Sequence, residues 1–185
     1  SRGLGDVYKR QVYWAHFPAG MLAIAQTRSL KMLKTFIWVL LSVALSANAA
    51  TAPYDESANA PAQIQASLQE AKATNKPVLV VFGANWCGDC KVLDMSFKTG
   101  PSAPLIQQHF TWVKVNVGKF DRNLDIAEAY GVPLKKGIPA IAVLSPAGKV
   151  IYATKSGDLA DARNMGDTAI FDFLAKVAST KPTTP

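Results

Sequence analysis

The stretch of sequence that decides the fold reads Val78-Leu79-Val80-Val81-Phe82-Gly83-Ala84-Asn85-Trp86-Cys87-Gly88-Asp89-Cys90-Lys91. Residues 77–83 form a short, continuous apolar run rich in β-branched side chains, which is typical of a central strand buried on both faces. Residues 92–97 follow without a helix breaker until Gly100-Pro101, so they predict a helix. The two cysteines, which are the only ones in the chain, are therefore expected at a strand-to-helix turn.

This placement predicts different chemistry for the two cysteines. Cys87 is expected beside the first free N–H groups of the helix, where the partial positive charge of the helix dipole favours a thiolate. A free thiol has a pKa of about 8.5, and such settings lower it to roughly 3.5–7.5. Cys90 is expected to be more buried, and could attack a mixed disulfide formed by Cys87 to close an internal disulfide. Cys87 is thus the predicted nucleophile and Cys90 the predicted resolving cysteine.

Two other interpretations of the cysteine pair are a structural zinc site and an inert disulfide. Zinc needs about four ligands, and beyond the two thiols the chain offers only His16 and His109. A disulfide across two residues closes a very small loop and removes little entropy from the unfolded chain. The spacing therefore favours a reversible Cys87–Cys90 disulfide, with no metal and no further cofactor.

From residue 60 to 179 the chain resembles the thioredoxin superfamily. Residues 78–91 resemble its active-site strand, turn and helix, and Gly137-Ile138-Pro139-Ala140 resembles the segment that carries its cis-proline opposite the cysteines. The resemblance implies a single-domain α/β fold, a three-layer α/β/α sandwich around a mixed central sheet. It implies that the partners are protein thiols or disulfides and an upstream redox partner. It also implies three substrate contacts: Trp86, Ile138 and Pro139.

Several positions depart from the thioredoxin pattern. The buried strand acid that helps to move the proton of the resolving cysteine is matched here by Val81, so that general base is absent. The lysine of the next strand is present as Lys114, which could favour a nearby thiolate or lie on a solvated strand face. Gly83 stands where thioredoxin has an aromatic residue. The extra residues 133–136 are expected to make the rim near the proline more basic, and residues 158–166 are either a helical linker or part of a partner-binding rim.

The two residues between the cysteines are expected to tune the redox couple. Gly88 adds backbone freedom, and Asp89 places a negative charge next to Cys90 and two residues from Cys87, which opposes thiolate formation. A carboxylate in the first turn also favours the helix itself. Weaker stabilisation of the thiolate makes the pair less oxidising, so the sequence favours a reductant or an isomerase-like protein over a strong oxidant.

Residues 32–49 have the pattern of a secretory signal peptide. Lys34 precedes the ten-residue apolar run Phe36–Leu45, and Ala47-Asn48-Ala49 matches a small-residue cleavage site. The run is shorter than the roughly 20 residues that span a bilayer, so cleavage after Ala49 is favoured over a lasting membrane anchor. Export would place the cysteines in an oxidising compartment, the bacterial periplasm. Residues 1–31 are then expected to be a non-native or mis-assigned upstream extension.

The basic charge of the chain belongs mostly to this leader. The 185 residues carry a formal net charge of +7, but residues 1–49 hold six of the 20 Lys and Arg residues and one of the 13 acidic residues. The remaining chain is close to neutral, at about +2. This excludes the strongly basic surface of a nucleic-acid-binding protein. The length that remains suits one domain, expected to be a monomer.

The rest of the chain predicts the order βαβ followed by ββα. Residues 50–60 are expected to be a flexible lead-in, residues 61–179 the thioredoxin-like domain, and residues 180–185 a disordered tail. The predicted helices and strands outside the active-site segment follow apolar periodicity and turn residues. They are helices at 62–74, 104–110, 121–130 (capped by Asp121) and 167–179, a strand at 111–117, and a hairpin of strands 140–144 and 149–154.

Three functions remain open from the sequence. The leading one is a periplasmic thiol–disulfide oxidoreductase that acts on protein cysteines. The alternatives are a binding or assembly module that keeps a passive disulfide, and a reductant dedicated to a single partner. The intact cysteine pair with Pro139 favours an enzyme over the passive module.

Overall fold

The computed structural model describes residues 52–180. The predicted upstream extension, the signal peptide and residues 181–185 of the predicted tail lie outside the described residues, so these expectations stay predictions. The described part belongs to one compact unit. Within it, no helix is both long enough and apolar enough to cross a membrane.

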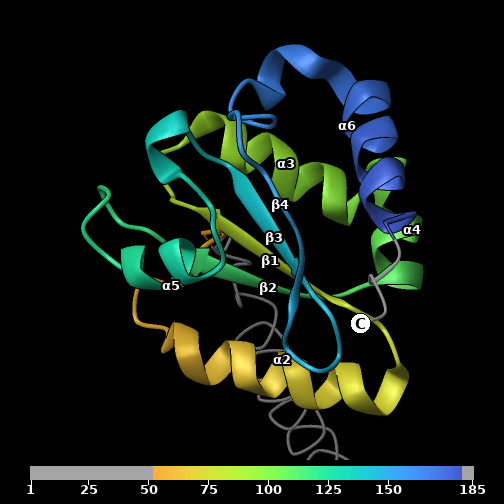
Figure 1. Ribbon diagram of the computed structural model, residues 1–185. Coiled ribbons are helices and arrows are strands. Elements are labelled where there is room, and N and C mark those ends of the chain that lie inside the picture. Colours follow the sequence, from red (N-terminus) through yellow and green to blue (C-terminus); the bar gives the residue numbers. More distant parts are fainter. Residues whose placement is uncertain (1–51, 181–185) are drawn as a thin grey trace, which may run out of the picture. The chain divides into compact units, whose positions relative to one another are not determined.

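A four-stranded sheet forms the centre of the domain, with strand order β2-β1-β3-β4 (Figure 1). Strand β1 pairs parallel with β2 and antiparallel with β3, so the sheet is mixed. All six residues of β1 are buried, as expected of a strand covered on both faces. The strands are β1 (Val78–Gly83), β2 (Thr111–Asn116), β3 (Ala140–Leu144) and β4 (Val150–Ala153).

Helices cover both faces of the sheet (Figure 1). On one face α2 (Ala60–Thr74) and α5 (Leu124–Ala129) contribute to a core that includes Val80 and Phe82. On the other face α3 (Gly88–Lys98), α4 (Ser102–His109) and α6 (Ala162–Ala178) enclose a second core around Leu79 and Val81. Because neighbouring residues of β1 point to opposite faces, this single strand contributes to both cores. The predicted three-layer α/β/α sandwich is confirmed.

Two predicted helix boundaries are wrong. The helix predicted at 121–130 begins only at Leu124, and Asp121 does not cap it. Phe120 and Asn123 have positive φ angles of 65° and 53°, which turn the chain away from a right-handed helix at this point. The Asp121 carboxylate instead accepts a hydrogen bond from the backbone N–H of Lys119 (2.9 Å).

The closing helix also begins earlier than predicted. α6 starts at Ala162, but Gly166 interrupts it with a φ of 72° and a ψ of 165°. This conformation is open to glycine and strained for other residues, so the helix predicted at 167–179 corresponds to the part after the break. The residues before the break bring Arg163 toward the cysteines.

Within the segment expected to be a flexible lead-in, the described residues include Tyr54, which packs into the core with its side chain 2% exposed. The backbone N–H of Tyr54 donates to Asn85 Oδ1 (2.9 Å), and Asn85 Nδ2 donates to the Tyr54 carbonyl oxygen (2.8 Å). These bonds tie the segment before α2 to the turn that carries Cys87.

Candidate active site

The turn after β1 places the two cysteines at the start of α3. Cys87 is the N-cap residue of α3, with an extended backbone, and its N–H donates to the carbonyl oxygen of Ala84 (3.1 Å). Its Sγ is bonded to Cys90 Sγ in a disulfide and accepts a hydrogen bond from the backbone N–H of Cys90 (3.1 Å). Cys87 is 4% exposed and Cys90 fully buried. The predicted strand-to-helix position is confirmed.

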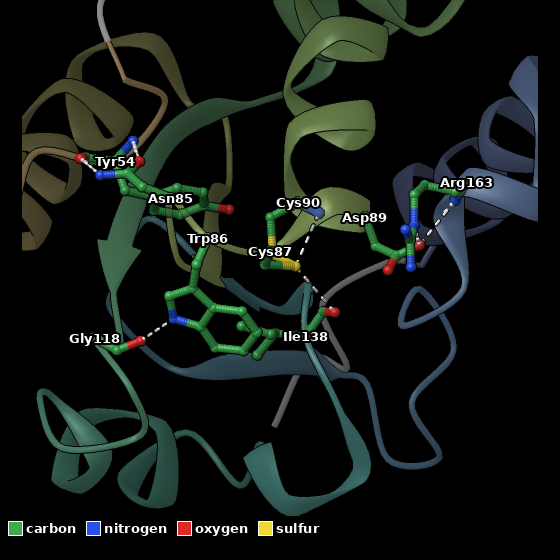
Figure 2. The surroundings of a disulfide bond; sticks show 9 residues. All are labelled: Tyr54, Asn85, Trp86, Cys87, Asp89, Cys90, Gly118, Ile138 and Arg163. Carbon is green, nitrogen blue, oxygen red and sulfur yellow. Dashed lines mark hydrogen bonds and ion pairs between the residues drawn. A yellow bond between two sulfur atoms is a disulfide. The ribbon is translucent and has the colours of Figure 1, made fainter.

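Ile138 lies directly opposite Cys87 (Figure 2). The peptide bond between Ile138 and Pro139 is cis. The carbonyl oxygen of Ile138 is 3.5 Å from Cys87 Sγ, so the backbone of this segment borders the sulfur that the sequence predicts to be the nucleophile. Two segments about fifty residues apart in the sequence thus meet at one sulfur.

Trp86 forms an exposed wall beside the disulfide. Its side chain is 55% exposed, and its indole N–H donates to the Gly118 carbonyl oxygen (2.7 Å; Figure 2). The Trp86 ring meets Phe120 edge to face, with 5.8 Å between ring centroids. Phe120 is 41% exposed. The sequence does not predict it as a site residue, because its place beside Trp86 goes with a left-handed backbone that the local sequence does not indicate.

Comparisons with known proteins agree with this geometry. A thioredoxin-like family model matches residues 59–146. A thioredoxin of Mycoplasmoides gallisepticum is 35% identical over 77 residues, which cover 42% of this chain and 68% of that protein. The chain belongs to the thioredoxin-like family. A solved structure described as a disulphide isomerase from Xylella fastidiosa Temecula1 is 50% identical, with a TM-score of 0.68, over 71% of this chain and all of that one.

A third relative is the thiol:disulfide interchange protein DsbD 1 of Pseudomonas aeruginosa. It is 45% identical over 42 residues, which cover 23% of this chain and 7% of that protein. With the cysteine disulfide at the start of α3, these relatives identify the thioredoxin-like chain as a thiol–disulfide oxidoreductase. No group of three or more His, Cys, Asp or Glu side chains suited to a metal occurs among residues 52–180.

Asp89 lies in a different environment from the one the sequence suggested. Its side chain is buried, and Oδ1 accepts hydrogen bonds from the backbone N–H (3.0 Å) and the Nε–H (3.2 Å) of Arg163. Burial alone raises the pKa of Asp89, but the two bonds and the charge of Arg163 outweigh it, and the pKa is lowered. The carboxylate is therefore ionised at neutral pH, and a guanidinium in contact with it offsets part of its charge.

The partner of Asp89 comes from the extra segment 158–166, whose role the sequence left open. The Arg163 side chain also lies over Gly88, because a Cβ placed there would come within 3.2 Å of it. Cys87 lines a pocket of about 360 Å³ together with Trp86, Asp89, Phe120, Ile138 and Arg163. The segment therefore forms part of the rim of the site.

The Lys114 ammonium group is not an unpaired charge, because it forms an ion pair with Asp94. Its Nζ lies 2.7 Å from Oδ1 of Asp94, a buried carboxylate on α3 that also pairs with Lys98. Val81, which is paired with Lys114 in register, is 2% exposed and carries no ionisable group. The carboxylate partner of this lysine thus comes from the active-site helix and not from β1.

The other extra segment, residues 133–136, builds a groove next to the site. Leu134–Lys136 form a short 3-10 helix, with Leu134 buried and both lysines exposed. The segment contributes to a groove of about 940 Å³ that meets the pocket of Cys87 at Phe120 and Gly137. We call it the apolar groove; its apolar lining consists of Phe120, Leu124, Val132, Pro133, Leu134 and Gly137.

Proposed function

We propose that this thioredoxin-like protein is exported to the periplasm and exchanges disulfides with protein cysteines, with Cys87 as nucleophile and Cys90 as resolving cysteine. The observation that carries the proposal is the asymmetry of the pair. Cys87 caps α3 and lines an open pocket opposite Ile138, whereas Cys90 has no exposed surface. The helix N-terminus favours a thiolate at Cys87. The signal-like residues 32–49 support export.

The surface around Cys87 fits an extended polypeptide. Trp86, Phe120 and Leu124 are 55%, 41% and 41% exposed and lead from the pocket into the apolar groove. The backbone of Ile138 borders Cys87, so a substrate segment could lie along Ile138 and Pro139 while its apolar side chains contact this surface. Exposed apolar surface of this kind marks a binding site for another protein.

We further propose that the pair acts as a reductant or an isomerase and not as a strong oxidant. The ionised Asp89 is the neighbour of Cys90 and lies two residues from Cys87, and its charge opposes thiolate formation. Arg163 offsets this charge only in part, because its side chain is 62% exposed and screened by water. Net reduction of substrates consumes the two thiols, so an upstream redox partner must restore them.

The reduction potential of the purified domain tests the direction. Equilibrium with glutathione buffers should give a value between about −270 and −180 mV, the range from thioredoxin to protein disulfide isomerase. The Asp89→Asn variant should shift the value about 15–30 mV toward a more oxidising pair, because loss of the negative charge stabilises the thiolate.

Asp125→Asn is the matched control, since Asp125 is an exposed acid in the first turn of another helix. It should leave the potential unchanged. A wild-type value near −120 mV, about that of a strong oxidant, would contradict the proposed direction. A value below about −300 mV, typical of structural disulfides, would contradict the proposed exchange itself.

A further inference from the structure

The Tyr54 hydroxyl and the Cys90 sulfur border the same space beside Gly83, the space that a side chain at this position would fill. Gly83 ends β1 and is buried. A Cβ placed on it would overlap the Tyr54 hydroxyl and lie 3.0 Å from Cys90 Sγ. Figure 2 shows the Tyr54 side chain directed toward Cys90. The glycine therefore leaves room for an aromatic ring that comes from a different part of the chain.

The position of the ring does not depend on its hydroxyl. The backbone of Tyr54 is held by two hydrogen bonds with the Asn85 side chain. The next turn of chain is held by Arg122, whose Nη1 donates to the carbonyl oxygen of Glu56 (2.9 Å). Replacement of Tyr54 by Phe should therefore keep the ring in place and remove only the oxygen atom and its proton.

The charged groups near Tyr54 keep its hydroxyl protonated. Burial raises the pKa of Tyr54, and the negative charge of Asp94 raises it further. Asp94, one helical turn after Cys90, is held by Lys114 and Lys98 at 2.7 Å each, and Lys114 Nζ lies 5.7 Å from the centre of the Tyr54 ring. At neutral pH the hydroxyl is therefore a hydrogen-bond donor and not a base.

We propose that the Tyr54 hydroxyl donates a hydrogen bond to the Cys90 thiolate and so acts as the positioning residue that prepares Cys90 to resolve the mixed disulfide. This inference rests on the proposed roles of Cys87 and Cys90. Val81 provides no acid beside the resolving cysteine, and full burial alone disfavours a thiolate. The Tyr54 hydroxyl borders the same space as Cys90 Sγ, and a hydrogen bond from it to the thiolate would lower that cost.

The step balances without any other reactant. The Cys90 thiolate attacks Cys87 Sγ of the mixed disulfide, the Cys87–Cys90 bond forms, and the bond from Cys87 to the substrate sulfur breaks. The substrate leaves as a thiolate and takes up the proton that Cys90 has lost. Tyr54 keeps its own proton throughout.

The test compares wild-type protein with Tyr54→Phe and with Tyr152→Phe, a control tyrosine that packs on Phe173. Reduced protein is mixed with a disulfide-bonded peptide, quenched with acid at intervals and analysed by mass spectrometry. In Tyr54→Phe the mixed disulfide at Cys87 should form at the wild-type rate. Its resolution should be about tenfold slower, with the pH profile of that step about one unit higher, as loss of a hydrogen bond to a charged group predicts.

The Cys87→Ser protein provides a second measurement that needs no turnover. Its Cys90 thiolate is followed by ultraviolet absorbance, and the titration should lie about one pH unit higher when Tyr54→Phe is added. An equal Cys90 titration with and without the Tyr54 hydroxyl, or equal resolution rates and pH profiles in both proteins, would overturn the role of Tyr54. Absence of any mixed disulfide at Cys87 in the wild-type protein would instead contradict the proposed function.

Discussion

The Cys90→Ala variant is expected to accumulate mixed disulfides with its substrates through Cys87, whereas the wild-type protein releases them. Cys87 lines the open pocket and caps α3, so its thiolate can attack a substrate disulfide. Without the buried Cys90 sulfur no internal thiol remains to break the resulting bond, because the chain contains only two cysteines. The adducts are identified by non-reducing electrophoresis and mass spectrometry of the variant expressed as the full chain.

The Cys87→Ser variant is the control. It should form no adducts and should lose at least about 1,000-fold of the exchange rate, because the nucleophile itself is missing. Many trapped proteins would support a general oxidoreductase, and a single one would support a dedicated reductant. Equal trapping in both variants would contradict the roles assigned to the two cysteines.

The Gly83→Ala variant is expected to be less stable by about 1–3 kcal/mol, measured by urea unfolding of the oxidised protein. The local sequence predicts the opposite sign. Gly83 lies within a strand and has no positive φ, and alanine at such a glycine usually stabilises a protein by about 0.4–1 kcal/mol. The structure predicts a loss because the new methyl group would overlap the Tyr54 hydroxyl and displace the buried ring.

A double-mutant cycle separates this contact from other effects of the methyl group. In a Tyr54→Ala background the overlap with the ring is gone and only Cys90 Sγ, 3.0 Å from the new methyl group, remains close, so Gly83→Ala should cost clearly less stability there. The same loss of stability in both backgrounds would show that Tyr54 does not fill the space above Gly83.

Local sequence patterns were sufficient to predict the centre of the fold. The apolar run of β1 predicts a strand that is covered on both faces. The cysteines come directly after this run, where the sequence predicts that a helix begins. Both features depend on neighbouring residues, and the structure agrees with both. The wrong boundary at Asp121 has a different origin: Phe120 adopts a left-handed conformation that its residue type does not favour, whereas Asn123 is of a type that tolerates it.

The parts of the site that were missed are long-range contacts. Arg163 meets Asp89 across 74 residues of sequence, so the sequence around Asp89 gives no sign of the positive charge that offsets it. Tyr54 lies in a segment whose Ala, Pro, Asn and Ser content suggests flexibility, and its anchor Asn85 is 31 residues away. The one local indication was Gly83, a small residue where an aromatic is usual, which left a space for a ring from elsewhere in the chain.

The order in which the two cysteines react tests the central claim most directly. Reduced wild-type protein is mixed with a disulfide-bonded peptide, quenched with acid at short intervals, alkylated and mapped by mass spectrometry. The peptide should appear first on Cys87, and this adduct should then decay as the Cys87–Cys90 disulfide forms. A peptide attached to Cys90, or a persistent dithiol with no adduct on either sulfur, would contradict the account.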